Sequence, residues 1–459
     1  MKLNNLSKNK SKNKSKNKSK NKYEYVIIGC GVSGITAGIE LTLANKSFHI
    51  FEKRDTNGGC WNDALETSEL QTDKRFYKLY GVDYPPNTPT FPNKQAMITY
   101  FNTAIKYYKL DKQITYNVKV DIDKLSKQDM TIDCNYNIDY KWKITLNTLS
   151  NNSNNIIYSE HILFCGGRNN IPKYPINTSI NKHYKQSSPP PKLISIHSSE
   201  FNRLSKTYKL RNKKIMIIGN SASGCDILKY LHNNLTTTTE ITMLYNSHKF
   251  YIRKCILGIS GAILLSNKFL TFFEECSLKL HYFLIMLANI IVFKLYLDIP
   301  YTKINSSNIV GSTIINDILR KNQNILSYQN EHIKTINNKL KLVTTNKSIY
   351  TDIDLVVFAT GYTTHTPIHF SYLYKYTIPI DEHYNIIEQN IAFIGYHLSY
   401  NFIEYCRDSV LWYLNTHTNN HIINNPSKLE KWVNKIKARK NKTNRDFYDL
   451  TYEVFEPFT

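Results

Sequence analysis

The stretch that decides the fold is Glu24-Tyr-Val-Ile-Ile28 followed by Gly29-Cys-Gly-Val-Ser-Gly34. The first five residues form a short β-rich run, and apolar residues such as Ile35 and Ile39 then recur at helical spacing. A second apolar run, 48–51, follows the expected helix. A strand, a G-x-G-x-x-G turn, a helix and a second strand predict a βαβ unit of a doubly wound α/β sheet.

Each glycine of this motif has a defined task in holding a dinucleotide. Gly29 permits the tight turn, Gly31 lets the backbone approach a pyrophosphate, and Gly34 lets helix and strand pack closely. The helix N-terminus points N–H groups and a positive dipole at the phosphates. Glu52 ends the second strand, where a carboxylate holds ribose hydroxyls. A glycine-rich turn without a ligand is the alternative.

The same order of elements recurs later in the chain. The run 215–218 leads to Gly219-Asn-Ser-Ala-Ser-Gly224, an amphipathic helix and a strand at 241–245. Each unit then has a stretch of hairpin-like alternation and closes with an apolar run that ends in glycine, 162–167 in the first unit and 355–361 in the second. The sequence therefore predicts two nucleotide-binding units of one design.

The second motif differs from the first in two ways. Ser221 replaces the middle glycine of Gly219-x-Ser-x-x-Gly224, and no acid follows its second strand. Polar and basic residues occupy that position, and an acid there would repel a 2′-phosphate whereas cations attract it. We therefore expect NADP(H) in preference to NAD(H), bound by Ser223 of the motif and by Asn246, Lys249 and Arg253, with His248 as a further candidate. An ordinary solvated loop in a lysine-rich protein is the alternative.

Two dinucleotide units on one chain suggest a redox relay. One unit would hold a resident cofactor and the other a diffusible hydride donor. Flavin is the natural resident because it accepts a hydride and passes electrons on singly or in pairs.

These residues resemble the flavin-containing monooxygenases over nearly all of 23–403. Glu52-Lys-Arg followed by Gly58-Gly-Cys-Trp61 is similar to the family's stretch beside FAD, and Phe358-Ala-Thr-Gly-Tyr362 is similar to its C-terminal A-T-G-Y motif. The apolar segment 255–297 is similar to an insertion of the YUCCA monooxygenases. The resemblance implies that FAD is held by the first motif together with Ser33, Lys53, Gly59, Trp61, Thr360 and Gly361.

The resemblance also implies a domain arrangement. Two Rossmann-like, three-layer domains are expected, with a discontinuous FAD domain at 23–205 and 345–459. An NADP domain at 206–344, carrying the apolar insertion 255–297, is inserted into it. Residues 1–22 are expected to form a disordered basic tail.

Two positions depart from the family pattern. The fingerprint between the two units keeps His197 and the terminal aromatic Phe201, but Pro191 and Leu193 replace its front half. Phe201 favours the monooxygenases over their Baeyer–Villiger relatives, and His197 is either a hinge and cofactor contact or a plain linker residue. Asp73 stands near the place of an Asn that contacts flavin in many relatives, so it is our candidate active-site residue.

The activity implied by the resemblance is an NADPH- and O2-dependent monooxygenation. A C4a-hydroperoxyflavin would transfer one oxygen atom to a small nitrogen- or sulfur-containing nucleophile or a keto substrate. One alternative is an FAD/NADPH oxidoreductase without oxygen transfer, either a reductase or an NADPH oxidase. The other is a flavoprotein whose catalysis has decayed, which the altered fingerprint and Asp73 keep open.

Composition limits the other possibilities. Of 459 residues, 41% are hydrophobic and 13% aromatic, which excludes global disorder. The net charge is +23, and nine lysines of residues 1–22 contribute to it. Part of the charge follows from abundant Lys, Asn, Ile and Tyr, whose codons are A/T-rich, so we expect no specific nucleic-acid partner. The tail is either a solvated segment or an electrostatic tether to anionic lipid or RNA.

Cysteine usage and the apolar segment bear on the compartment. The eight cysteines include no C-x-x-C and no zinc-like His pairing, so we expect no metal, no disulfide framework and a reducing, cytoplasmic location. No apolar run follows the charged N-terminus, so secretion is not expected. The runs 256–267 and 282–293 are shorter than the roughly 20 residues a membrane span needs. Buried or substrate-covering helices and peripheral membrane contact both remain open.

Overall fold

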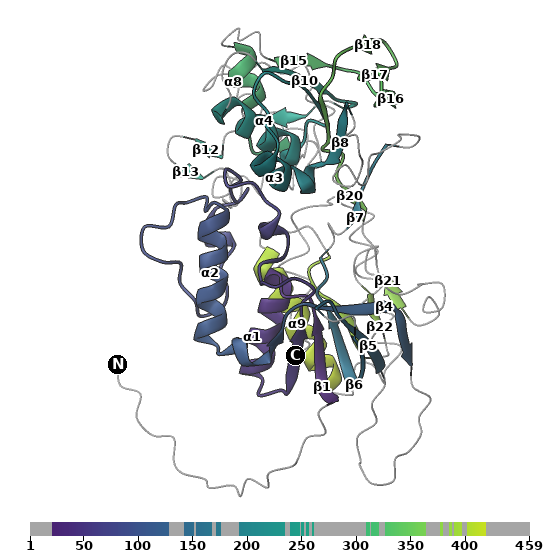
Figure 1. Cartoon of the computed structure of the whole chain (residues 1–459). Coiled ribbons are helices and arrows are strands. Elements are labelled where there is room, and N and C mark those ends of the chain that lie inside the picture. The colour runs from purple at the N-terminus through teal and green to yellow at the C-terminus, as the bar shows by residue number, and fades with distance from the viewer. Residues whose placement is uncertain are drawn as a thin grey trace, which may run out of the picture.

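The computed structural model describes residues 21–127, 142–150, 153–167, 171–175, 192–234, 239–247, 249–251, 254–256, 259–260, 309–312, 314–320, 326–363, 377–379, 385–387, 390–396 and 402–418. They form two large sheets, a mixed one in the lower half and a parallel one in the upper half of Figure 1, each accompanied by helices. This arrangement confirms the predicted α/β fold with two Rossmann-like units.

The first sheet has nine strands, and its central path runs in the order β21-β22-β23-β6-β1-β2-β3. Strand β1 pairs in parallel with β2 and β6, while β4 and β5 extend the sheet as an antiparallel meander from β6. The strands are β1 (Lys22–Ile28), β2 (Phe48–Phe51), β3 (Ile114–Thr115), β4 (Val118–Lys127), β5 (Trp142–Thr148), β6 (Ser153–Phe164), β21 (Thr377–Pro379), β22 (Asn385–Ile387) and β23 (Ile391–Phe393).

The second sheet has five strands, all parallel, in the order β15-β10-β9-β19-β8. Beside it lies a small antiparallel sheet of β16, β17 and β18. The strands are β8 (Ile194–His197), β9 (Lys214–Ile218), β10 (Glu240–Leu244), β15 (Leu326–Gln329), β16 (Ile333–Asn337), β17 (Leu342–Thr345), β18 (Ile349–Tyr350) and β19 (Leu355–Phe358).

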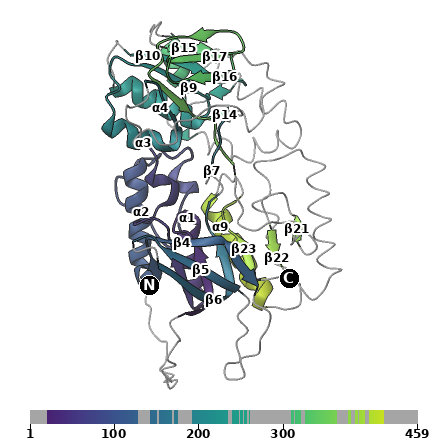
Figure 2. The same cartoon turned by 45° about the vertical axis from the view of Figure 1, so that its right-hand side comes forward.

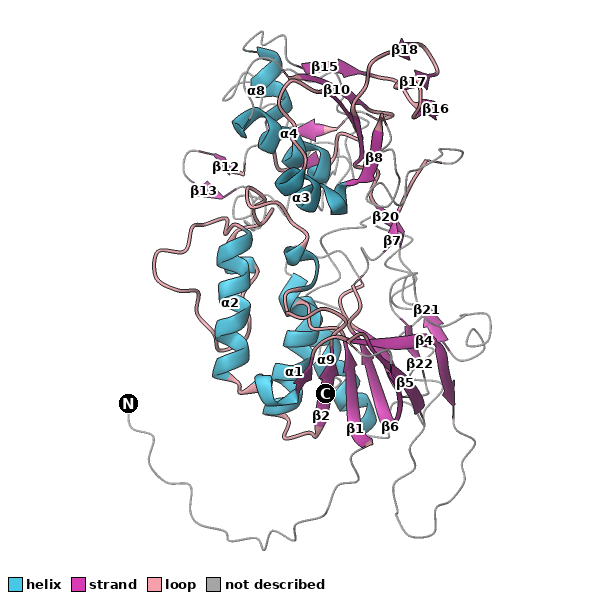
Figure 3. Cartoon of the chain, viewed as in Figure 1, coloured by secondary structure: helices cyan, strands magenta, loops and turns pink. Residues whose placement is uncertain are grey.

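Helices accompany both sheets, and short elements lie in the connections (Figure 3). The α-helices are α1 (Val32–Leu43), α2 (Lys94–Tyr107), α3 (Ser198–Thr207), α4 (Ala222–Asn234), α8 (Ile314–Arg320) and α9 (Phe402–Thr418). The short elements are η1 (Gly59–Asn62), η2 (Lys74–Phe76), η3 (Leu110–Gln113), β7 (Ile171–Pro172), β11 (Phe250–Tyr251), β12 (Cys255–Ile256), β13 (Ile259–Ser260), β14 (Ile309–Val310) and β20 (Tyr362–Thr363).

Strand periodicity explains how each sheet buries both of its faces. In β1, Tyr25 and Ile27 pack with α1, α2 and α9, whereas Val26 and Ile28 pack with residues of β4 and β5. Successive side chains of a strand point to opposite faces, so one apolar run serves two core clusters. Strand β9 repeats this arrangement with the helices on one face and the β16–β18 sheet on the other. Figure 2 shows the two units from a second side.

The internal repeat predicted from the sequence is present in the strand pairing. Val26 of β1 lies opposite Ile162 of β6, and Ile217 of β9 lies opposite Val357 of β19. In each unit the first and last strands of the repeat are therefore parallel neighbours. Both glycine motifs consequently lie at the carboxyl end of a central strand, which is the ligand-binding edge of such sheets.

Two strands lie outside the domain to which the predicted boundaries assigned them. Residues 194–197 and 355–358 were expected in the FAD domain, but β8 and β19 pair in the five-stranded sheet with β9. The pairing places both segments in the second sheet, in agreement with the repeat for 355–358, and the domain limits themselves stay a prediction. The reason is that an apolar strand shows from its sequence that it is buried, but not which neighbour it pairs with. The tail at 1–20 and nearly all of 255–297 lie outside the described residues.

Candidate functional site

The first glycine motif has a backbone that only glycine accommodates at two of its positions. Gly29 has φ +102°, and a Cβ there would lie 2.7 Å from the carbonyl oxygen of Cys165. A Cβ on Gly34 would lie 1.9 Å from the carbonyl oxygen of Gly29. Both clashes involve backbone atoms, which cannot move aside cheaply. Gly29 and Gly34 are thus required by the turn itself, as the sequence predicted.

Gly31 has a different surrounding. Its φ of −79° suits any residue, and an added Cβ would meet only the Cα of Gly59, at 3.5 Å. Gly31 is also the N-cap of α1, where it provides no side-chain cap, and no acid occupies the first turn. Among the described residues, the first turn of α1 therefore presents backbone N–H donors. The two residues beside them, Gly31 and Gly59, have no side chains. This arrangement fits the pyrophosphate of a dinucleotide.

Glu52 lies at the end of β2 and is buried, with 4% of its surface exposed. Its Oε2 accepts a hydrogen bond from the Cys30 backbone N at 2.6 Å, and its Oε1 accepts one from the Arg54 N at 2.9 Å. Each oxygen keeps further acceptor capacity, because a carboxylate has about four lone-pair sites. The carboxylate is thereby held beside the glycine turn, where the sequence predicts a ribose.

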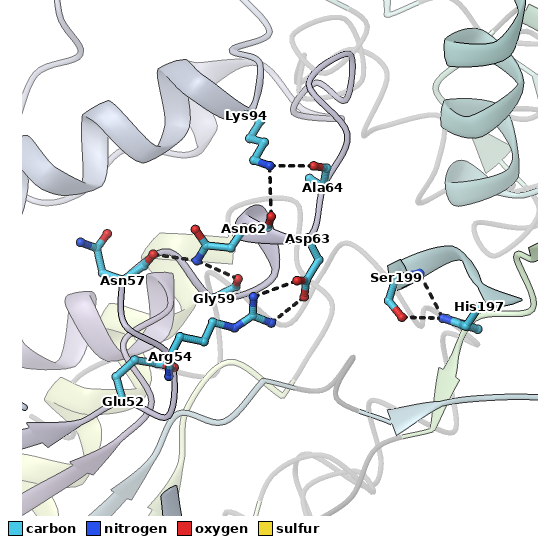
Figure 4. Close-up of polar contacts among 10 residues, drawn as sticks. All are labelled: Glu52, Arg54, Asn57, Gly59, Asn62, Asp63, Ala64, Lys94, His197 and Ser199. Carbon is cyan, nitrogen blue, oxygen red and sulfur yellow. Dashed lines mark hydrogen bonds and ion pairs between the residues drawn. The ribbon is translucent and has the colours of Figure 1, made fainter. Parts of the chain in front are cut away.

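Lys53, which the sequence assigned to this site, has an exposed side chain. Its neighbour Arg54, which the sequence did not mark as a site residue, is half-buried. Arg54 forms a two-pronged ion pair with Asp63, at 2.8 and 2.5 Å (Figure 4). These hydrogen bonds to Asp63 raise the pKa of the Arg54 guanidinium. No local pattern marks Arg54 in preference to Lys53.

The loop that carries Gly59 and Trp61 is braced from several sides. Asn62 Nδ2 donates to the carbonyl oxygen of Asn57 at 2.8 Å, and Lys94 Nζ donates to the carbonyl oxygens of Asn62 and Ala64, both at 3.0 Å (Figure 4). Trp61 is half-buried and packs against the core cluster that β1 forms with α1, α2 and α9. Gly59 has φ +56°, and its Cβ would lie 3.0 Å from the Cα of Gly31. The glycine pair 31/59 therefore brings this loop against the first motif.

Two other residues assigned to the first site, Ser33 and Asp73, contact neighbouring side chains of the protein. Ser33 is buried, with its Oγ 3.6 Å from the sulfur of Cys406 on α9. Asp73 is fully buried and is the N-cap of η2. Its Oδ1 accepts hydrogen bonds from Arg75 N and Nε, and its Oδ2 lies 2.6 Å from Arg75 Nη2. These contacts give Asp73 a structural role, and a contact with flavin stays a prediction.

The second motif repeats the backbone of the first. Gly219 has φ +111°, and its Cβ would lie 2.4 Å from the carbonyl oxygen of Ala359. A Cβ on Gly224 would lie 2.1 Å from the carbonyl oxygen of Gly219. Ser221 is exposed just before α4, and Ser223 is half-buried in its first turn. A serine fits at position 221 without distorting the turn.

The strand end predicted to select NADP is described in part. Asn246 is exposed and Lys249 is half-buried, and burial lowers the pKa of the Lys249 ammonium. Arg253 and His248 lie outside the described residues. Beside this tip is a polar cluster that the sequence did not indicate. Asn220 Nδ2 donates to Tyr328 Oη at 2.8 Å and to the Ser247 carbonyl oxygen at 3.1 Å.

The two fingerprint residues have separate tasks. His197 is fully buried, and its Nδ1 accepts from the Ser199 backbone N at 3.2 Å. The proton of the neutral ring therefore lies on Nε2, which donates to the Gly361 carbonyl oxygen at 2.9 Å. Burial lowers the pKa of His197, which favours this neutral form. Phe201 is a core residue of α3, and its ring meets that of Tyr230 edge-on.

The A-T-G-Y segment is thus tied to the second unit. Thr360 Oγ1 donates to the carbonyl oxygen of Lys173, and the ring of Tyr362 lies 4.8 Å from that of His197. The structure brings His197, Thr360 and Gly361 together after β8 and β19. They lie at the carboxyl edge of the second sheet, and a role of His197 as a hinge or cofactor contact stays a prediction.

Comparisons with known proteins agree with this geometry. Residues 27–102 match the NAD(P)-binding Rossmann-like domain family. An FAD-binding monooxygenase of Aspergillus niger is 25% identical over 233 residues, which cover 50% of this chain and 35% of that protein. The probable indole-3-pyruvate monooxygenase of Arabidopsis thaliana, a YUCCA protein, is 22% identical and covers 74% of this chain and 76% of its own. The chain is thus similar in sequence to flavin-dependent monooxygenases.

The solved structures that share this fold include further flavin-containing monooxygenases. A cyclohexanone-bound cyclohexanone monooxygenase superposes with a TM-score of 0.65 at 13% identity, covering 93% of this chain and 94% of its own. The flavin-containing monooxygenase of Stenotrophomonas maltophilia gives a TM-score of 0.55 at 14% identity, covering 85% and 98%. The chain spans only about a third of the length of the first curated relatives that it matches. Among the described residues no helix is long and apolar enough to cross a membrane.

Proposed function

We propose that this chain is an FAD-dependent, NADPH-using monooxygenase of a small molecule. The observation that carries the proposal is the pair of glycine turns, each at the carboxyl end of a central parallel strand and each opening a helix. A relative in fold, OTEMO, was determined in complex with FAD and NADP, and its TM-score is 0.63. One chain with two such turns is suited to bring two dinucleotides together.

FAD is assigned to the first unit. The N–H groups of the first turn of α1 would bind its pyrophosphate between Gly31 and Gly59, and Glu52 would accept from its ribose. The Arg54–Asp63 ion pair holds the loop that would cover it. Trp61 from this loop, and Thr360 and Gly361 from the second unit, would border the flavin.

NADPH is assigned to the second unit. The start of α4 with Gly219, Ser221, Ser223 and Gly224 would bind its pyrophosphate. Asn246, Lys249 and Arg253 would bind the 2′-phosphate, because a cation beside the second strand favours an anion there. The domain limits 23–205, 206–344 and 345–459 remain part of this proposal, apart from β8 and β19.

The bound cofactors would supply the redox chemistry, with flavin taking hydride from NADPH and activating O2 as C4a-hydroperoxyflavin. The chain would orient the two cofactors and exclude water from the region between them. The substrate classes are a small nitrogen- or sulfur-containing nucleophile or a ketone. One structural relative is an ornithine N-hydroxylase with FAD, NADP+ and ornithine, at a TM-score of 0.60.

An oxidoreductase without oxygen transfer is the second candidate. A bacillithiol disulfide reductase from Bacillus cereus shares the fold with a TM-score of 0.50 at 14% identity. The contacts of Asp73 with Arg75 also favour a site that departs from the monooxygenase pattern. A decayed flavoprotein that binds FAD without turnover is the third outcome of the test.

Stopped-flow spectroscopy separates these candidates. The purified FAD-loaded protein is reduced anaerobically with NADPH, or with NADH as the control, and then mixed with oxygenated buffer. A long-lived oxygenated flavin spectrum would support the monooxygenase and justify a substrate screen. Direct return to oxidised flavin with hydrogen peroxide would favour the reductase or oxidase. Flavin that neither nucleotide reduces would leave only the decayed flavoprotein.

A further inference from the structure

Five polar residues from distant parts of the chain meet between the two units. Glu69 Oε1 lies 3.3 Å from Lys229 Nζ and Glu69 Oε2 lies 3.1 Å from Lys254 Nζ. The adjacent Ser68 Oγ donates to Asp226 Oδ2 at 2.8 Å. We call these residues the Glu69 cluster; its members are Ser68, Glu69, Asp226, Lys229 and Lys254. The two carboxylate oxygens of Glu69 are thus paired with two cations of the second unit, Lys229 and Lys254.

The cluster is balanced in charge and only partly open to solvent. It contains two carboxylates and two ammonium groups, and the Lys254 side chain is 18% exposed. Burial lowers the pKa of Lys254 and raises that of Asp226. Burial also works to raise the pKa of Glu69, but the two lysines together hold it below its ordinary value. Removal of one carboxylate would therefore leave a cation without its partner in a partly desolvated place.

On the first unit the cluster is anchored to the start of α2. The Leu70 backbone N donates to the Pro92 carbonyl oxygen at 2.8 Å, and the Lys94 N donates to the Ser68 carbonyl oxygen at 3.2 Å. Lys254 Nζ also donates to the Leu70 carbonyl oxygen at 3.0 Å. Four residues before Glu69, the Leu65 side chain is buried in the core cluster of the second unit. The segment 65–70 therefore joins the units by an apolar and an ionic contact.

On the second unit the cluster lies on the helix that follows the glycine turn. Asp226 comes two residues after Gly224, and Lys229 lies one turn further along α4. The start of this helix is the end assigned to the nicotinamide dinucleotide. A shift of α4 relative to segment 65–70 would therefore move that dinucleotide relative to the first motif.

We propose that Glu69 is a positioning residue that sets the distance and orientation between the two dinucleotide sites. It would act through Lys229 and Lys254, to which both of its carboxylate oxygens are paired. This inference rests on the proposed function, because the positions that it fixes matter for hydride transfer from one cofactor to the other. An error of about 1 Å in such a geometry costs on the order of a hundredfold in rate.

The test compares three variants of the full chain. E69Q keeps the shape of the side chain but loses its charge, and E69D keeps the charge on a shorter side chain. E240Q is the matched control, since Glu240 is 71% exposed and forms an ion pair with Lys214 inside the second unit. For each protein we would measure the rate of anaerobic flavin reduction at saturating NADPH, the Kd for NADPH, and hydrogen exchange of 65–73 and of the start of α4.

A positioning role predicts a split between rate and affinity. In E69Q, flavin reduction should slow about tenfold or more while the Kd for NADPH changes less than about threefold. Exchange should become faster at 65–73 and at the start of α4, E69D should recover part of both effects, and E240Q should match the wild type. An unchanged reduction rate in E69Q would overturn the proposal. A loss of NADPH affinity that accounts for the slower rate would also overturn it.

Failure of the proposed function would look different. If NADPH and NADH both leave the wild-type flavin oxidised, the redox assignment fails, but hydrogen exchange still reports on the cluster. Faster exchange in E69Q and not in E240Q would then show that Glu69 joins the units. Equal exchange in the two variants would remove Glu69 as a link.

Discussion

The Nε2 atom of His197 lies 2.9 Å from the carbonyl oxygen of Gly361, so a residue at the end of β8 is bonded to the loop after β19. Because burial lowers the pKa of His197, the folded state favours the neutral ring. The neutral His197 ring therefore stabilises the folded state. This stabilisation is complete above the pKa of histidine in the unfolded chain, about 6.5, and it declines as the pH falls toward the lower pKa of His197 in the folded state. His197→Gln removes this titration. We expect the stability advantage of the wild type over H197Q in urea unfolding to shrink between pH 7.5 and 5.5. An advantage that grows on acidification would contradict the neutral assignment.

Replacement of Gly31 by Ala separates the needs of the fold from those of a ligand. The added methyl group meets only the Cα of Gly59 at 3.5 Å, so G31A should fold with little change in Tm. It should nevertheless lose FAD, because the methyl group occupies the space for the pyrophosphate. Flavin content after purification and the Tm of the apoprotein measure the two effects. G34A is the comparison, and its clash at 1.9 Å should prevent folding. Normal FAD content in G31A would remove this motif from the site.

Asp63→Asn tests the ion pair that holds the loop 57–64. The change leaves Arg54 with a neutral partner, and loss of such a partly exposed ion pair costs about 1 kcal/mol. We expect FAD to bind roughly threefold to fivefold more weakly, as measured by fluorescence titration of the apoprotein. Asp55→Asn is the control, since Asp55 is exposed and lies just before this loop. Equal FAD affinity in D63N and D55N would show that the ion pair does not support the site.

The role of Asp73 can be separated from that of its ion pair. Asp73→Asn and Arg75→Gln both remove the pair at 2.6 Å, so both should lower stability, by about 1–3 kcal/mol in D73N, where the buried partner is changed. If Asp73 also contacts flavin, D73N alone should raise the yield of product per NADPH consumed. The product yield per NADPH, measured for both variants and the wild type, decides whether Asp73 contacts flavin. The same yield in D73N and R75Q would leave Asp73 a purely structural residue.

Lys249→Gln tests the assignment of the second dinucleotide. An ammonium group beside a 2′-phosphate favours NADPH, whereas NADH lacks that phosphate. We expect the KM for NADPH to rise about tenfold or more in K249Q and the KM for NADH to change little. Lys334→Gln, at an exposed residue of strand β16 in the same unit, controls for a change of net charge. A similar rise for both nucleotides would place Lys249 away from the 2′-phosphate.

Much of the fold and the core of the candidate site were predictable from local pattern. The glycines at 29, 34, 219 and 224 mark turns that other residues cannot adopt, as the clashes with Cys165, Gly29 and Ala359 backbone atoms explain. The apolar runs beside them gave the central strands, and the repeat gave two units. The sequence did not distinguish Lys53 from Arg54, because both are basic and only the fold decides which one turns toward Asp63.

The sequence by itself thus determined two βαβ units and the place of their glycine turns, because steric limits on the backbone and the period of apolar residues are local properties. Only the tertiary structure decided that β8 joins the second sheet, that His197 bonds to Gly361, and that Glu69 meets Lys229 and Lys254. These partners are far apart in the chain. No local pattern records which of many chemically similar strands, lysines or carbonyl groups will become neighbours after folding.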